Sequence, residues 1–147
     1  MSDQLSIITL LLQNERGLAE LYSAYSQIFE NRDFWANLSK DEESHSQFLI
    51  ALYENPDVPP IDQDVIDVRK FTNIAEEIEH DILKAPTTTL QNALARAIYY
   101  EEVVLERNVF DLFATKNSSS ILKVIERLRD ETNEHRESLI QELAKYN

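Results

Sequence analysis

The sequence predicts an all-α fold, and three observations support this. The chain has 147 residues but only one glycine and four prolines, so few residues interrupt a helix. Three of the prolines, Pro56, Pro59 and Pro60, fall in one short segment. Apolar residues recur with helical spacing along most of the chain, and the alternation typical of strands is absent. We therefore expect a single helical domain, residues 1–147, with a substantial core.

Four long helical patterns are predicted, separated by segments rich in turn-forming residues. They cover residues 4–29, 33–53, 89–114 and 120–144, and a weaker pattern covers 72–84. Asp33 is expected to cap the second long helix. Thr88 and Gln91 have the spacing of a capping box before the third.

The connections predict the topology. Short turns join the first helix to the second and the third to the fourth, so each of these pairs should be antiparallel neighbours. The link between Asn55 and Thr88 is long enough to run the length of a bundle. The expected fold is therefore a four-helix bundle with one long crossover between helices 2 and 3, which is the connectivity of ferritin-like folds.

Each predicted helix carries an ionisable residue within its apolar stripe. Glu15 lies on the first, Glu42 and His45 on the second, Glu101 on the third and His135 on the fourth. Glu42 and His45 are three residues apart, so they lie on one helix face. Burial of an unpaired charge is costly, so a salt bridge, a hydrogen-bond network or a metal ion should compensate these groups.

A weak internal repeat relates the two helix pairs. The stretch "ERGLAELY" from Glu15 parallels "EEVVLERN" from Glu101. The stretch "LSKDEESHSQFLI" from Leu38 parallels "LRDETNEHRESLI" from Leu128. A duplicated helix pair would place two equivalent ligand sets around a pseudo-two-fold axis.

With these motifs, nearly the whole chain resembles the rubrerythrin-like branch of the ferritin-like diiron-carboxylate superfamily. The family pattern has a Glu seven residues before a Tyr on one helix and Glu-x-x-His on the next, and it occurs twice. Glu15 and Tyr22 match the first part, and Glu42 and His45 match the second. In the second copy Glu101 fits, whereas Asn108 stands where a Tyr is expected.

The fourth helix departs from the family pattern. Thr132, and not a Glu, stands three residues before His135. Glu131, four residues before His135, borders the apolar stripe and is the alternative carboxylate. Threonine is not a strong ligand for iron, so this helix places the symmetry of the site in question.

The resemblance implies a non-haem dimetal oxidoreductase that reacts with O2 or peroxide. Its ligands would be Glu15, Glu42, His45, Glu101, Glu131 and His135, with Tyr22 behind them. Glu15 and Glu131 would be mainly terminal ligands, Glu42 and Glu101 would bridge, and each metal would take one histidine. Carboxylate and imidazole ligands suit two iron ions, with manganese or zinc as alternatives. Two cations would also hold carboxylates that otherwise repel one another.

Composition excludes several other classes of protein. The formal charge of −13 disfavours nucleic acid and anionic membranes as partners. The chain has no cysteine, which excludes disulfides, thiolate zinc sites and cysteine-held iron centres. A peroxidase activity would therefore need an external electron donor. The apolar run "IITLLL" is too short for a membrane span, and the expected location is the cytoplasm.

Two other functions fit the same sequence. Iron oxidation and storage, as in ferritins, would require a large hollow assembly, whereas a homodimer would suffice for an oxidoreductase. A metal-free helical bundle acting as an interaction module is the third interpretation, and Thr132 favours it. A Glu-x-x-His spacing alone is weak support for a metal site. Glu77 and His80 share it beside an apolar stripe, where we expect both to be solvated.

Overall fold

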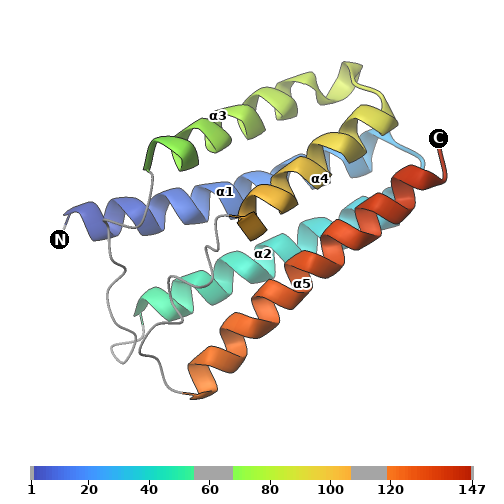
Figure 1. The fold of residues 1–147 in the computed structure, drawn as a ribbon. Helices are drawn as coiled ribbons and strands as arrows, with labels where there is room; N and C mark the ends of the chain where they lie inside the picture. Colours follow the sequence, from blue (N-terminus) through green and yellow to red (C-terminus); the bar gives the residue numbers. More distant parts are fainter. Residues whose placement is uncertain (1, 55–67, 107–118, 147) are drawn as a thin grey trace. The chain divides into compact units, whose positions relative to one another are not determined.

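The computed structural model describes residues 2–54, 68–106 and 119–146. Its helices are α1 (Ser2–Ile28), α2 (Arg32–Glu54), α3 (Val68–Lys84), the 3-10 turn η2 (Ala85–Thr87), α4 (Leu90–Glu106) and α5 (Ser119–Ala144). The all-α prediction is confirmed for these ranges, which hold no strand (Figure 1). None of the described helices combines the length and the apolar content needed to cross a membrane.

The helices group into two compact units. Unit 1 contains α1, α2, α3 and η2, and unit 2 contains α4 and α5. That all 147 residues form one domain stays a prediction.

The boundaries of the helices largely match the sequence pattern. α1, α2 and α5 begin and end within two residues of the predicted positions. The weaker pattern is a longer helix than expected, because α3 already begins at Val68. α4 begins at Leu90, and residues 107–114 of the predicted helix lie outside the described residues.

The two capping predictions were wrong by one and two residues. Thr89, and not Thr88, caps α4, because its Oγ1 atom accepts the N–H of Asn92 at 3.1 Å. A capping side chain reaches the amide three residues on, so the cap is fixed by where the helix begins. Asp33 lies inside the first turn of α2, and Asn31 precedes this helix. The carbonyl of Asn31 accepts the backbone N–H of Trp35, and its Oδ1 atom accepts the indole N–H.

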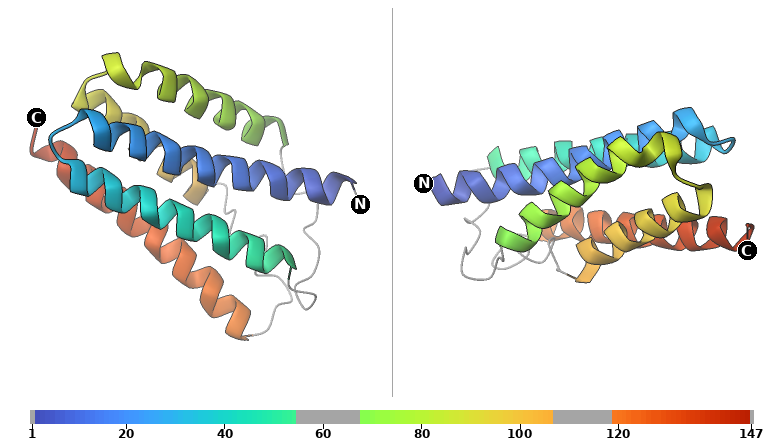
Figure 2. Two further views of the ribbon diagram at one scale, coloured as in Figure 1. Left: turned by 180° about the vertical axis from the view of Figure 1, so that it is seen from behind. Right: turned by 90° about the horizontal axis from the view of Figure 1, so that it is seen from above.

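In unit 1, α1 contacts α2 along one side and α3 along another. α2 runs antiparallel to α1, whereas α3 runs in the same direction as α1 (Figures 1 and 2). The only glycine, Gly17, lies where α1 meets α3. A Cβ atom there would come within 3.0 Å of the Ile78 Cγ2 atom. The missing side chain therefore permits a close approach of the two helices.

An aromatic cluster packs α1 against the start of α2. Trp35 is fully buried at its centre, and its ring centroid lies 4.8 Å from that of Tyr25 and 5.8 Å from that of Tyr22. Phe29 and Phe34 complete the cluster at 6.4 and 5.4 Å from Trp35. Large buried rings contribute much of a core's stability, so this cluster anchors the α1–α2 pair.

In the described part of unit 2 most core side chains are aliphatic, and one fully buried ring, that of Tyr100, lies among them. α4 and α5 are antiparallel (Figure 1). Their buried apolar residues include Ala93, Leu94, Ala97, Leu128 and Leu139. On the surface, the Arg136 Nε atom of α5 lies 3.2 Å from the Glu102 Oε1 atom of α4.

Candidate metal centre

The α1–α2 pair brings three predicted ligands together inside unit 1. Glu15 lies near the middle of α1 and is 5% exposed. Glu42 and His45 lie one turn apart on α2, and each is 1% exposed. Their burial follows from the apolar stripes that contain them, because Leu11, Leu18, Leu38 and Leu49 on the same helices are also buried.

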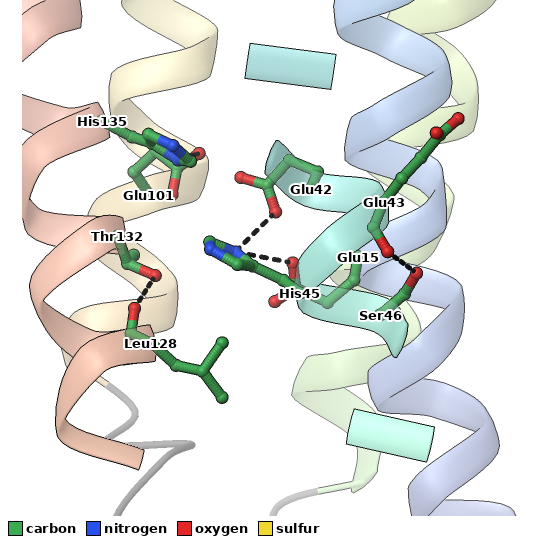
Figure 3. Close-up of polar contacts among 9 residues, drawn as sticks. All are labelled: Glu15, Glu42, Glu43, His45, Ser46, Glu101, Leu128, Thr132 and His135. Atoms are coloured by element: carbon green, nitrogen blue, oxygen red, sulfur yellow. Dashed lines mark hydrogen bonds and ion pairs between the residues drawn. The ribbon is translucent and has the colours of Figure 1, made fainter. Parts of the chain in front are cut away.

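One imidazole nitrogen faces both carboxylates. The His45 Nδ1 atom lies 3.5 Å from the Glu42 Oε2 atom and 3.9 Å from the Glu15 Oε2 atom (Figure 3). The three residues offer donor atoms that all lie within 4.8 Å of one another. We call this set the three-donor cluster. Two of its donors are carboxylates, which would carry like charges at close range in an apolar core.

These three side chains could hold a metal ion. Nitrogen and oxygen ligands lie roughly 2.0–2.2 Å from zinc, so two donors on one ion are at most about 4.4 Å apart. Both measured separations from His45 Nδ1, 3.5 and 3.9 Å, are within that limit. A cation at this position would compensate both carboxylates while the neutral imidazole binds through Nδ1.

Unit 2 repeats part of this arrangement. The His135 Nδ1 atom lies 3.9 Å from the Glu101 Oε1 atom, and both residues are buried. Thr132 is buried as well, but its Oγ1 atom donates a hydrogen bond to the Leu128 carbonyl at 2.9 Å (Figure 3). The hydroxyl is therefore occupied within its own helix.

Glu131 belongs to neither set of close donors within these units. Its Oε1 atom lies 3.0 Å from the Arg127 Nε atom, and its side chain is 29% exposed. Glu131 is thus paired with Arg127, one turn earlier on α5. That it serves as a metal ligand stays a prediction.

The burial pattern supports the weak internal repeat. Leu38, Glu42, His45 and Leu49 of α2 are all buried. The residues 90 positions later on α5, Leu128, Thr132, His135 and Leu139, are buried too. α2 and α5 therefore present four equivalent positions, and they differ chemically at the second. In the other half of the repeat, the stretch from Glu101 to Asn108 corresponds to Glu15 to Tyr22. Its residues Val104, Leu105 and Asn108 lie outside the residues whose side chains are described.

Tyr22 is fully buried two helical turns beyond Glu15, roughly 10 Å along the helix axis. Its ring packs on Trp35, so it joins the aromatic cluster behind the three-donor cluster. Glu77 and His80, the second Glu-x-x-His pair, were both expected to be solvated. His80 is exposed as expected, whereas Glu77 is half-buried.

Some buried polar groups were not predicted. Asn14 is buried next to Glu15, and within the described residues its Oδ1 atom has no hydrogen-bond partner. Ser39 of α2 donates a hydrogen bond to the Ala19 carbonyl of α1 at 2.7 Å. Glu142 is buried and lies 2.8 Å from the Lys145 Nζ atom, which raises the pKa of Lys145. Small polar residues inside helical stripes give no distinctive sequence signal, so only the structure reveals them.

A groove with a cavity of about 430 Å³ lies between α1 and α2. Arg16, Glu43 and Ser46 line it, and each directly follows a member of the three-donor cluster in sequence. The cluster residues do not line the groove. Adjacent residues point about 100° apart around a helix, so the groove belongs to a different face of the helix pair.

Comparison of the chain with protein-family models, curated proteins and solved structures finds no match.

Proposed function

We propose that the chain is a dimetal carboxylate protein that reacts with O2 or peroxide. In this proposal α1, α2, α4 and α5 are the helices of a ferritin-like bundle, and the segment between Asn55 and Thr88 is its crossover. Iron is the favoured metal, and an external donor supplies electrons. The observation that carries the proposal is the three-donor cluster. Its two carboxylates and one imidazole are buried with donor atoms within 4.8 Å of one another.

The proposed chemistry divides between metal and protein. Bound redox-active metal ions supply the electrons that reduce O2 or peroxide. Glu15 and Glu42 contribute negative charge that holds a cation, and His45 contributes a neutral nitrogen donor. The buried side chains of Leu11, Leu18 and Leu49 belong to the same helices and help to exclude water.

The remaining ligands are proposed from sequence symmetry. Glu101 and His135 take the places in unit 2 that Glu15 and His45 take in unit 1. Glu131 would have to leave Arg127 before it could bind a metal. Tyr22 is assigned a place behind the ligands, because it lies two turns beyond Glu15 on the same helix.

Metal removal tests the proposal. A metal that binds only the folded state adds about 2.7 kcal/mol at 100 times its dissociation constant. Removal of metal by a chelator should therefore lower the melting temperature by roughly 5–10 °C, and added iron or manganese should restore it. The measurements are metal content after purification without chelator and thermal unfolding followed by circular dichroism.

The chain offers a matched control for this experiment. His45→Ala should abolish the chelator effect, whereas His80→Ala, at the same spacing in an exposed position, should preserve it. Equal chelator effects in both variants would contradict the assignment of the cluster. The absence of bound metal and of any chelator effect in the wild type would favour a metal-free bundle. A very large particle in size-exclusion chromatography would favour iron storage.

A further inference from the structure

We propose that the groove between α1 and α2 binds a free amino acid. The groove is separate from the candidate metal centre, so this inference goes beyond the proposed function. Its cavity of about 430 Å³ is within the usual range for small-molecule sites, roughly 300–1,000 Å³. The lining mixes charged side chains, hydroxyls and an amide with the apolar Ala19 and Ile50. A ligand should therefore be recognised mainly by its charges and hydrogen bonds.

The first step of the argument is that opposite charges line the groove from opposite helices. Ser39 of α2 donates a hydrogen bond to the Ala19 carbonyl of α1, so these two residues lie at one level. The two helices are antiparallel, and Glu43, four residues after Ser39, is therefore level with residue 15, four before Ala19. Arg16 follows directly, and both Arg16 and Glu43 line the groove. A guanidinium and a carboxylate thus face the same cavity.

The second step is that these two charges are not paired. Within the part of the chain that the structure describes, neither Arg16 nor Glu43 forms an ion pair. The Glu43 side chain also points away from the three-donor cluster (Figure 3). A ligand with a carboxylate and an ammonium group could pair with both residues. Its carboxylate would accept hydrogen bonds from the planar guanidinium of Arg16, and its ammonium group would donate to Glu43.

The third step concerns two buried serines in the lining of the groove. Ser39 and Ser46 each donate the hydroxyl proton to a backbone carbonyl at 2.7 Å, Ser39 to Ala19 and Ser46 to Glu43 (Figure 3). A hydroxyl oxygen keeps lone pairs after it has donated, so both serines present acceptors to the cavity. An ammonium group has three N–H donors and no acceptor. It therefore suits the side of the groove that Glu43 and Ser46 form.

Charge also favours a zwitterion over a simple ion. The formal charge of the chain is −13, which repels a simple anion. A simple cation would meet the guanidinium of Arg16 at the level of Glu43. An amino acid has no net charge and satisfies both side chains. The groove should therefore prefer an amino acid to either of its singly charged derivatives.

The test is saturation-transfer NMR of the full-length chain, titrated with each standard amino acid in turn. At least one amino acid should bind saturably. Its methyl ester keeps only the ammonium group, and its N-acetyl derivative keeps only the carboxylate. Each derivative should bind roughly tenfold more weakly or worse, because one charge-assisted hydrogen-bonded pair is lost. Saturable binding of no amino acid, or equal binding of either derivative, would overturn the inference.

Substitutions locate the ligand in the groove. Arg16→Gln and Glu43→Gln should each weaken binding of the amino acid roughly tenfold or more, and Arg16→Gln should not weaken binding of the ester. Arg32→Gln and Glu30→Gln are matched controls, because both positions are exposed and neither lines the groove. Both controls should keep the wild-type affinity. Full affinity in either groove variant, or an equal loss in the controls, would overturn the inference.

The same variants separate this inference from the proposed function. Arg16 and Glu43 are exposed and lie outside the three-donor cluster, so both variants should fold and keep the chelator effect on the melting temperature. Circular dichroism checks both points. An amino acid that binds a chain without metal would leave this inference standing while the proposed function fails. Metal without amino-acid binding would do the reverse.

Discussion

Unit 1 and unit 2 each hold a glutamate 3.9 Å from the Nδ1 atom of a histidine, but only unit 1 adds a carboxylate three residues before that histidine. In unit 2 the equivalent position is Thr132, whose hydroxyl is satisfied by its own helix. Equivalent buried positions on α2 and α5 thus hold a charged side chain in one helix and a neutral side chain in the other. The distance between the histidine and its glutamate is therefore kept in both units, although the residue three positions before the histidine differs.

The two units also differ in what holds their helices together. Unit 1 has a third helix and an aromatic cluster centred on Trp35. The described part of unit 2 has mainly aliphatic core side chains, one fully buried ring at Tyr100, and surface ion pairs such as Arg136–Glu102. We therefore expect substitutions in unit 1 to have the larger effects on stability.

The largest effect is expected for Trp35→Ala. This change removes a fully buried indole and its contacts with Tyr22 and Tyr25, and it should cost about 3–5 kcal/mol. Urea unfolding followed by circular dichroism measures the loss. Leu128→Ala is the comparison in unit 2 and should cost about 2–5 kcal/mol. A smaller loss for Trp35→Ala than for Leu128→Ala would break the comparison between the units.

An intermediate effect is expected for Gly17→Ala. The new methyl group would lie 3.0 Å from the Ile78 Cγ2 atom, and such overpacking typically costs about 1–3 kcal/mol. Alanine also favours the helix by about 1 kcal/mol, so the net loss should be about 1 kcal/mol.

The sign of this effect should reverse when the neighbour is removed. In an Ile78→Ala background, Gly17→Ala should stabilise the chain by up to about 1 kcal/mol, because only the helix preference remains. The measurement is a double-mutant cycle in urea. If Gly17→Ala stabilises the wild type, α3 can shift away from the new methyl group without loss of stability. The close α1–α3 contact would then not be tightly packed.

The smallest effect is expected for Arg136→Gln. This change removes the ion pair with Glu102 and a second one with Glu137, both on the surface of unit 2. Exposed ion pairs typically contribute about 0.2–1 kcal/mol and are screened by salt. The loss should therefore stay below about 1 kcal/mol and vanish near 1 M sodium chloride. A larger loss that persists at high salt would mean that unit 2 depends on this pair.

Much of the fold could be predicted from sequence, because apolar periodicity and scarce breakers determine where helices form. The start of α4 was misplaced by one residue, since Thr88 and Thr89 both have capping side chains and only the geometry selects Thr89. The contact of α3 with α1 could not be predicted. It depends on a tertiary fit between Gly17 and Ile78, and this fit has no local signal.

For the candidate site, the sequence predicted five buried residues but not the hydrogen bond of Thr132 or the ion pair of Glu131. Glu15, Glu42, His45, Glu101 and His135 were predicted from their positions in apolar stripes, and all five are buried. The role of Thr132 could not be inferred, because a buried threonine can bond its own helix or a neighbour. Glu131 had a suitable residue type beside the stripe, but the competing pair with Arg127 lies on the same helix face.

The short connection between Ile28 and Arg32 has a consequence for the timing of synthesis. The three-donor cluster lies entirely between residues 15 and 45, within one local helical hairpin. Local contacts of this kind form quickly, and ribosomes add roughly 5–20 residues per second. The ribosome therefore completes α2, which ends at Glu54, about 5–20 s before it adds Asn147. The nascent chain can therefore form the three-donor cluster before α4 and α5 have been made.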